Sequence, residues 1–252
     1  MTRIIMHGCN GKMGQVITGI CAADPECEIV AGIDISNHIT TNPYPVFTDI
    51  NACDVEADVI IDFASPKATD GLLEYCKLKK LPLVLCTTGL SDEQIASVSE
   101  YSKSVAILRS ANMSLGINML LKELKAVTAV LAPAGFDIEI VEKHHNQKLD
   151  APSGTALALA DSINEELNRE CNYVYDRSKE RKKRDPKEIG ISAVRGGSIV
   201  GEHEVIFAGT DEVITITHTA YSKAIFANGA VQAAKFLAGK PAGLYDMSQV
   251  VG

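Results

Sequence analysis

Aromatic side chains are scarce in this chain. It has no tryptophan, and only 5% of its 252 residues are aromatic, so the core must be aliphatic. Long apolar runs are also missing, because none approaches the roughly 20 residues of a membrane-spanning helix. The first residues run straight into glycine-rich sequence, without the apolar core of a signal peptide. We therefore expect a cytoplasmic protein with no membrane partner.

The cysteines show no pairing pattern. Their number is odd and no two of them have CxxC spacing; the seven lie at positions 9, 21, 27, 53, 76, 86 and 171. This argues against a disulfide framework and against a zinc site. It predicts buried, reduced thiols and no bound metal.

Basic residues are outnumbered, since 24 Lys and Arg face 32 Asp and Glu and the formal net charge is −8. An acidic surface argues against binding to nucleic acids, and an anionic substrate would need a local basic pocket. One dense basic run, residues 177–187, contains seven Lys and Arg. It fits either an anion-binding patch or a solvated loop. We favour the loop, because a short basic run in an acidic protein is usually exposed.

Strand-like and helix-like segments alternate over the first 110 residues. Short apolar runs predict strands at 3–7, 28–34, 57–63, 81–85 and 106–108. Helical spacing predicts helices at 12–23, after Ser65-Pro66, and after Ser91, which has Gln94 at the capping-box position. Such alternation predicts a doubly wound, parallel α/β sheet.

The pattern changes in the second half. Helices are predicted at 115–131 and 155–167, and strands at 136–142, 191–194, 198–207 and 213–219. Because strands now follow strands, we expect an α+β domain with an open sheet, mixed or mostly antiparallel. A small-residue helix at 226–237 would return to the first domain. The expected domains are 1–112 with 224–252, and 113–223.

A glycine-rich turn follows the first predicted strand. Gly8, Gly11 and Gly14 have the spacing G-x-x-G-x-x-G, a variant of the Rossmann dinucleotide fingerprint. Glycines let the backbone approach a pyrophosphate, and the following helix N-terminus binds its charge. A plain strand–helix turn is the alternative, and the context favours a dinucleotide. The expected contacts are Gly8, Cys9, Asn10, Gly11, Lys12 and Met13.

An acidic residue, Asp34, ends the second predicted strand 20 residues after Gly14. Its carboxylate would accept a hydrogen bond from the ribose 2′-hydroxyl and repel a 2′-phosphate. Ile35 and Ser36 supply no arginine to bind such a phosphate. The chain should therefore use NADH and/or NADPH, with NADH favoured.

Two further segments follow later strands. They are Cys86-Thr87-Thr88-Gly89 and Ser110-Ala111-Asn112-Met113. In a doubly wound sheet the carboxyl ends of the strands line the ligand crevice, and Thr or Asn there can bind a nicotinamide carboxamide. Each segment alone is more often a turn or a helix cap. We include Cys86, Thr87, Thr88 and 110–113 among the expected cofactor contacts.

Two histidines and a lysine are clustered between a predicted strand and a predicted helix. His144, His145 and Lys148 fall in an expected loop at 143–153, and Ser153 or Asp150 would cap the helix. The free amides of Gly154 and Thr155 would then face an anion. Histidine is the side chain best suited to donate a proton near neutral pH. We interpret the segment as a proton donor beside an anion site rather than as polar loop residues.

Residues 142–156 read E-x-H-H-x-x-K-x-D-A-P-S-G-T-A, and with this segment the chain resembles the 4-hydroxy-tetrahydrodipicolinate (dihydrodipicolinate) reductase family. The resemblance covers essentially the whole chain. Five further family motifs occur in order: G-x-x-G-x-M-G at 8–14, T-T-G at 87–89, A-N-M-S at 111–114, R-x-G-x-I-x-G-x-H at 195–203, and F-A-x-G-A at 226–230.

The resemblance implies an oxidoreductase that reduces 4-hydroxy-tetrahydrodipicolinate, a cyclic dicarboxylate, to tetrahydrodipicolinate on the diaminopimelate route to lysine. It implies that His144 donates the proton, that Lys148 is its catalytic companion, and that His145, Gly154 and Thr155 bind substrate carboxylates. It also implies a homotetramer, with 113–223 serving substrate binding and oligomerisation.

The chain departs from the family at two positions. Ile35 stands where members that use NADPH well often carry arginine, and Lys223 stands at a usual arginine, losing its bidentate fork. Two rival functions are an aspartate dehydrogenase-like oxidoreductase, which shares the nucleotide domain, and a non-catalytic dinucleotide sensor. The first would not need the His-His-Lys segment, and the second would need a partner-binding element.

Overall fold

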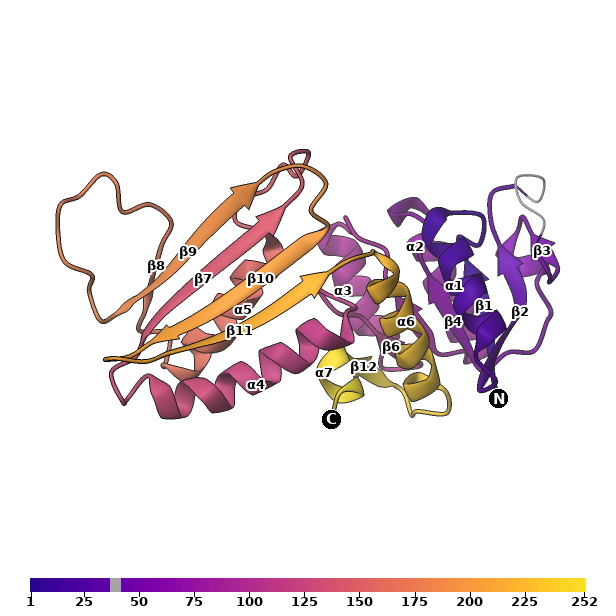
Figure 1. Cartoon of the computed structure of the whole chain (residues 1–252). Helices are drawn as coiled ribbons and strands as arrows, with labels where there is room; N and C mark the ends of the chain where they lie inside the picture. Colours follow the sequence, from indigo (N-terminus) through magenta and orange to yellow (C-terminus); the bar gives the residue numbers. More distant parts are fainter. Residues whose placement is uncertain (37–41) are drawn as a thin grey trace. The chain divides into compact units, whose positions relative to one another are not determined.

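The computed structural model describes residues 1–36 and 42–252, and the chain divides into two compact units. The first contains Met1–Leu115 and Ala224–Gly252, and the second contains Gly116–Lys223 (Figure 1). Among the described residues, no helix is both long and apolar enough to cross a membrane.

A seven-stranded sheet forms the centre of the first unit, and every pairing in it is parallel. The strand order is β12-β6-β5-β4-β1-β2-β3. The strands are β1 (Thr2–His7), β2 (Cys27–Ile33), β3 (Val46–Phe47), β4 (Val59–Asp62), β5 (Leu83–Leu85), β6 (Ala106–Leu108) and β12 (Gly243–Tyr245). The order reverses between β1 and β4, which is where a doubly wound sheet binds its ligand. The predicted parallel α/β class is confirmed.

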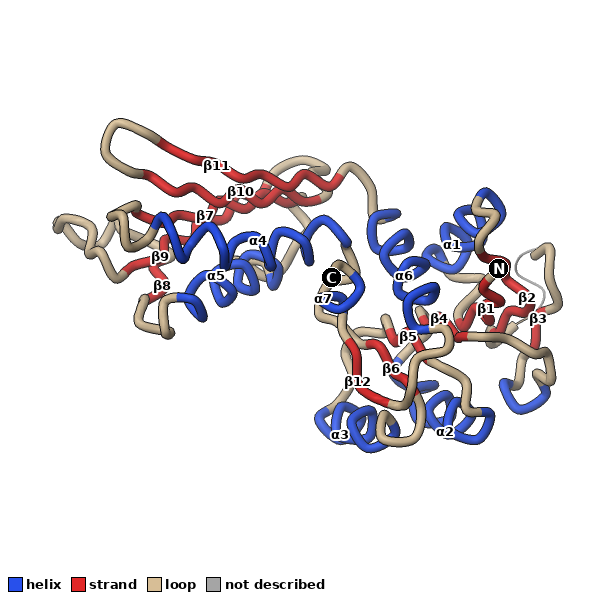
Figure 2. The backbone as a smooth tube through the Cα atoms, turned by 90° about the horizontal axis from the view of Figure 1, so that it is seen from below, coloured by secondary structure: helices blue, strands red, loops and turns tan. Residues whose placement is uncertain are grey.

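Helices cover both faces of this sheet (Figure 2). On one face, α1 (Lys12–Ala23) and α6 (Ala224–Leu237) pack on the alternate strand residues that include Ile4 and Met6. On the other, α2 (Thr69–Lys79) and α3 (Asp92–Tyr101) pack around Ile5. Helix α6 belongs to the first unit, to which the sequence analysis expected a helix at 226–237 to return. Short helices occur at Ile50–Ala52 (η1), Pro66–Ala68 (η2) and Met247–Val250 (α7).

One local prediction about the first unit is confirmed, and a prediction about the cysteines holds in part. The capping box forms at the start of α3, where the Ser91 hydroxyl accepts the Gln94 N–H at 3.2 Å and the Gln94 side chain accepts the Ser91 N–H. The seven cysteines, six of them in this unit, are unpaired; five are buried as predicted, but Cys86 and Cys171 are only partly buried. Burial raises the pKa of the Cys76 thiol, so it behaves as a small apolar side chain.

The second unit contains a five-stranded sheet in the order β11-β10-β7-β9-β8. Its strands are β7 (Asp137–His144), β8 (Asn172–Val174), β9 (Glu188–Arg195), β10 (Gly201–Ala208) and β11 (Val213–Ala220). Helices α4 (Leu115–Leu131) and α5 (Gly154–Glu166) pack on one face of it. Two pairings are antiparallel and two are parallel, so the sheet is mixed, not mostly antiparallel. The chain crosses over through α5 between β7 and β9, which makes that pair parallel.

The end of β7 differs from the prediction. The strand was expected to end at position 142, with a loop at 143–153, but it continues through Lys143 and His144. The reason is pairing on both sides, since Lys143 pairs with Glu202 of β10 and His144 pairs with Arg195 of β9. His144 is therefore fixed by a strand and is not a loop residue.

The basic run at 177–187 is only partly the solvated loop that was favoured. Three of its exposed lysines, Lys179, Lys182 and Lys187, form ion pairs with nearby acidic side chains. Arg184, however, is largely buried, and it contacts Asp137 at 2.8 Å and Glu139 at 3.1 Å on β7. Two arginines of the run thus anchor it to the sheet, because Arg177 also pairs with Glu139.

Candidate active site

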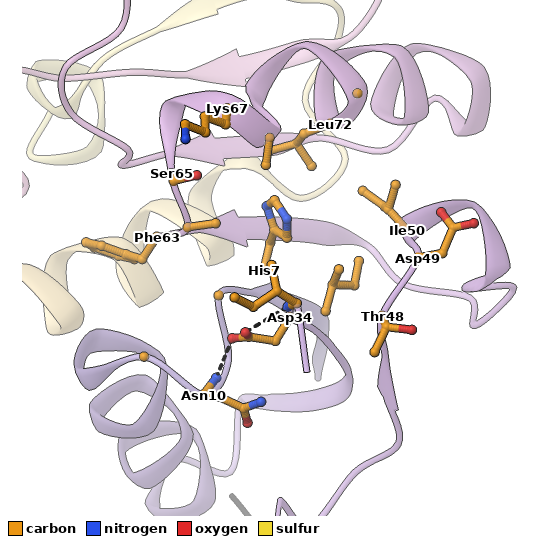
Figure 3. A pocket seen from close by; sticks show the side chains of 17 residues that line it. His7, Asn10, Asp34, Thr48, Asp49, Ile50, Phe63, Ser65, Lys67 and Leu72 are labelled. Atoms are coloured by element: carbon orange, nitrogen blue, oxygen red, sulfur yellow. Dashed lines mark hydrogen bonds between the residues drawn. The ribbon is translucent and has the colours of Figure 1, made fainter. Parts of the chain in front are cut away.

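A cavity of about 670 Å³ lies at the carboxyl ends of β1, β2 and β4 (Figure 3). Gly8, Asn10, Gly11 and Asp34 line it, as the fingerprint predicted. The sequence analysis missed its other walls, which come from the ends of β1 and β4, from η1 and from the start of α2. Such a cavity is large enough for part of a dinucleotide.

The glycine turn has no room for side chains. Gly8 has φ +84°, and a Cβ there would lie 2.9 Å from the backbone of Phe63. A Cβ at Gly14 would lie 2.4 Å from the Gly8 carbonyl oxygen. Gly11 is the N-cap of α1 and provides no side-chain cap, and the first turn carries no acidic residue. The turn therefore brings bare backbone and a helix N-terminus to the cavity, as an anion requires.

Asp34 is held in place by the same turn. Its carboxylate accepts the N–H of Asn10 at 2.9 Å and the N–H of Ile35 at 2.8 Å (Figure 3). The side chain of Ile35 is 93% exposed and provides no cation. The carboxylate thus lies on the cavity wall, where a ribose hydroxyl can reach it.

The remaining expected cofactor residues do not line this cavity. Cys9 is buried in the core, and burial, reinforced by Asp34, raises the pKa of its thiol to about 11, so only its backbone can contact a ligand. Lys12 and Met13 begin α1. Cys86, Thr87 and Thr88 follow β5, and Ser110, Ala111, Asn112 and Met113 follow β6, at the same carboxyl edge of the sheet.

Glu142 is a fully buried carboxylate in the second unit, to which the sequence analysis gave no role. Both of its oxygens accept from Arg195 at 2.7 Å, and the Ser153 N–H donates to Oε1 at 2.9 Å. Burial acts to raise the pKa of Glu142, but the hydrogen bonds from Arg195, His144 and Ser153 outweigh it and hold the pKa below its usual value. Both Glu142 and Arg195 belong to the quoted family motifs, and that was the only signal in the sequence that could have found them.

His144 takes its orientation from Glu142. Its Nδ1 lies 2.6 Å from Glu142 Oε2, so Nδ1 carries a proton and Nε2 is the outward nitrogen. A Cβ at position 201 would lie 3.1 Å from Nε2, which explains the glycine there. The ring of His203 approaches edge-on at 5.1 Å, and burial lowers the pKa of His203 to about 4. His203 is therefore neutral at pH 7, and His144 is the candidate proton donor of the two.

The predicted carboxylate-binding groups lie at the start of α5. Ser153 is the cap, since its hydroxyl accepts the Ala156 N–H at 3.2 Å, and Asp150 is not. Instead, Asp150 pairs with Lys148 at 2.8 Å, and Lys148, with help from the Gly154 N–H, lowers the pKa of Asp150. An internal carboxylate thus contacts Lys148, the expected catalytic companion, and the amide of Gly154, which was expected to hold a substrate carboxylate.

His145 differs from its neighbour. It is half-buried, and its ring makes no hydrogen bond to any residue in the described part of the chain, whereas His144 is buried and tied to a carboxylate. Nothing in the spacing of the sequence distinguished the two imidazoles. Their contacts do: one is oriented by an ionised partner, and the other keeps both nitrogens available for a ligand.

Comparison with known proteins extends over the whole chain. Family models described as "Dihydrodipicolinate reductase, N-terminus" and "Dihydrodipicolinate reductase, C-terminus" match residues 2–113 and 116–251. A 4-hydroxy-tetrahydrodipicolinate reductase from Caldanaerobacter subterraneus is 53% identical over 100% of this chain and 98% of the relative. One from Clostridium tetani is 52% identical over 98% and 96%.

A solved structure is similar in fold. It is described as dipicolinate-bound dihydrodipicolinate reductase from Paenisporosarcina sp. TG-14, with a TM-score of 0.81 and 24% identity over 98% of this chain and 97% of that one. At this identity the likeness concerns the fold. Dehydrogenases such as a probable one from Thermotoga maritima align less closely, with a TM-score of 0.57 and 12% identity over 99% and 93% of the two chains.

Proposed function

Because the chain belongs to the dihydrodipicolinate reductase family, we propose that its two units divide one reduction between them, the first binding the dinucleotide and the second the substrate. The enzyme is an oxidoreductase that converts 4-hydroxy-tetrahydrodipicolinate to tetrahydrodipicolinate on the diaminopimelate route to lysine. The family match favours this function over an aspartate dehydrogenase-like enzyme or a dinucleotide sensor.

The dinucleotide site is the cavity of the first unit. The close packing at Gly8 and Gly14 admits no side chain, so bare backbone lines the turn, and the amides at the start of α1 face a pyrophosphate. Asp34 accepts a hydrogen bond from the adenosine ribose. When bound, the dinucleotide supplies the hydride that reduces the substrate. Cys86, Thr87, Thr88 and residues 110–113 extend this site along the sheet edge.

The proton comes from His144. Glu142 holds Nδ1, so a proton at Nε2 points away from the carboxylate and can quench the negative charge that reduction leaves on the substrate. Lys148 assists, and His145, Gly154 and Thr155 bind the substrate carboxylates, because a cation, a free imidazole and a helix N-terminus all favour anions. The observation that carries this assignment is the buried contact of 2.6 Å between Glu142 and His144.

We expect kcat/KM to be several-fold higher with NADH than with NADPH. Asp34 repels a 2′-phosphate, and neither Ile35 nor Ser36 provides a cation to bind one. Steady-state oxidation of both dinucleotides, with substrate supplied by the coupled synthase, measures the ratio. A several-fold preference for NADPH would refute the role given to Asp34, and absence of turnover with either would refute the reductase function.

Replacing Lys148 by alanine should reduce turnover and weaken inhibition by pyridine-2,6-dicarboxylate, because the substrate carboxylates lose their cation. The measurement is Ki alongside kcat. An unchanged Ki in Lys148→Ala would count against the anion site.

Asp150→Ala is the matched variant with the opposite expected sign. It removes a carboxylate that competes for Lys148 and Gly154, so Ki should fall by roughly 1.5- to 5-fold, the size of an exposed ion pair. Weaker inhibition in both variants would show instead that the pair acts as one structural unit.

We also propose a cytoplasmic homotetramer. Seven unpaired thiols suit a reducing compartment, and assembly follows the family resemblance. The second unit offers surface for assembly, since β11 exposes Val213 and Ile214. Sedimentation velocity measures the mass in solution, and a monomer at micromolar concentration would refute the tetramer.

A further inference from the structure

His7 is a buried polar residue in an otherwise apolar part of a strand. It is the last residue of β1, follows Ile4, Ile5 and Met6, and is only 7% exposed. Its ring lies on the wall of the dinucleotide cavity (Figure 3). A histidine at such a place is costly unless its ring nitrogens are paired.

One of those nitrogens has a partner. His7 pairs in register with Asp62 at the end of β4, and Nδ1 lies 2.7 Å from Asp62 Oδ1. Asp62 is 1% exposed, and the same oxygen accepts the Ala64 N–H at 3.1 Å. Because a carboxylate oxygen only accepts, Nδ1 is the donor in this contact. Asp62 therefore fixes both the tautomer and the direction of the ring.

The other nitrogen has none. Among the residues the structure describes, no group makes a hydrogen bond with Nε2 of His7. The ring belongs to the cavity wall that also contains Asp34, Gly8 and Gly11. A purely structural histidine needs only its Asp62 contact, whereas the second nitrogen of this ring belongs to the wall of an open cavity, where a ligand hydroxyl can pair with it.

We propose that His7 is a cofactor-binding residue whose Nε2 forms a hydrogen bond with the adenosine ribose, at the 3′-hydroxyl, while Asp34 takes the 2′-hydroxyl. This inference rests on the proposed dinucleotide site. A hydroxyl both donates and accepts, so it pairs with Nε2 whether or not that nitrogen carries a proton. Asp62 is the positioning residue, because it acts on the ligand only through His7.

Two substitutions separate the nitrogens of the ring. In His7→Asn the amide replaces Nδ1, so the Asp62 contact is kept and Nε2 is lost. In His7→Gln the longer side chain carries its amide to the position of Nε2. ADP is the probe, and isothermal titration measures its Kd for the wild type and both variants.

The wild type should bind 3′-deoxy-ADP roughly 2- to 12-fold more weakly than ADP, the value of one neutral hydrogen bond. His7→Asn should bind ADP that much more weakly and should no longer distinguish the two ligands. His7→Gln should keep most of the distinction. All three proteins should still discriminate against 2′-deoxy-ADP, which reports on Asp34.

The proposal is overturned if His7→Asn binds ADP as the wild type does, or if it still distinguishes 3′-deoxy-ADP fully. It is also overturned if His7→Asn no longer distinguishes ADP from 2′-deoxy-ADP but still distinguishes ADP from 3′-deoxy-ADP. Thermal melting of each variant identifies a protein that has failed to fold, and His7→Gln then provides the test. If the wild type oxidises NADH with substrate, and both variants bind ADP and its deoxy analogues as the wild type does, only the role of His7 is refuted. If the wild type binds no ADP, the dinucleotide site itself fails.

Discussion

Replacing His144 by glutamine is expected to lower kcat by roughly 10²- to 10⁴-fold, the usual contribution of a positioned general acid. Glutamine can still approach Glu142 and fill the space beside Gly201, but it cannot release a proton near neutral pH. The Kd for NADH should remain unchanged, because the first unit binds the dinucleotide. Single-turnover kinetics together with NADH titration measure both quantities.

His145→Gln is the matched control for this experiment. It changes the adjacent imidazole, which has no carboxylate partner in the described residues, so it should raise KM and the Ki of pyridine-2,6-dicarboxylate more than it lowers kcat. Near-normal turnover in His144→Gln, or an exchange of the two phenotypes, would remove His144 from the acid role.

Glu142→Gln should have the second-largest effect, on stability and on activity together. The amide keeps the volume but removes the buried, bidentate carboxylate partner of Arg195, whose side chain is 19% exposed. Breaking a buried ion pair at one partner costs about 3–5 kcal/mol of unfolding free energy. The ring of His144 also loses its ionised partner, so kcat should fall. Denaturant unfolding and kcat at a temperature where the variant is folded give the two values.

Glu202→Gln provides the comparison on a neighbouring strand. Glu202 pairs with Lys143 at the surface of β10, and exposed pairs contribute at most about 1 kcal/mol. Its kcat should stay close to that of the wild type. If Glu142→Gln were as stable and as active as Glu202→Gln, Glu142 would have no special role in orienting His144.

Five strands of the first sheet were predictable because their signals are local, whereas the short edge strands β3 and β12 were not predicted. Each predicted strand is a short apolar run, and the Gly8 turn and Asp34 have physical requirements that only a few residue types meet. The end of β7 was missed for the opposite reason. Lys143 and His144 are charged or polar, as loop residues often are, and only pairing with β9 and β10 makes them strand.

The polar contacts that orient the two rings could not be derived from spacing. Arg195 lies 53 residues from Glu142, and Asp62 lies 55 residues from His7. Each pair forms because two strands align in one register, and register depends on the packing of whole sheets. The sequence could indicate which residues carry chemistry, but not which partner holds them.

The part of the chain that completes the first sheet is synthesised after the whole second unit. Helix α6 packs on β4, β5 and β6, and β12 is the edge strand beside β6. A ribosome releases residues in order, so the earlier strands leave the tunnel well before α6 exists to cover Ile4, Met6 and Ile61. An apolar part of that sheet face therefore stays open until α6 has been made, which leaves the nascent chain exposed to non-native association in the meantime.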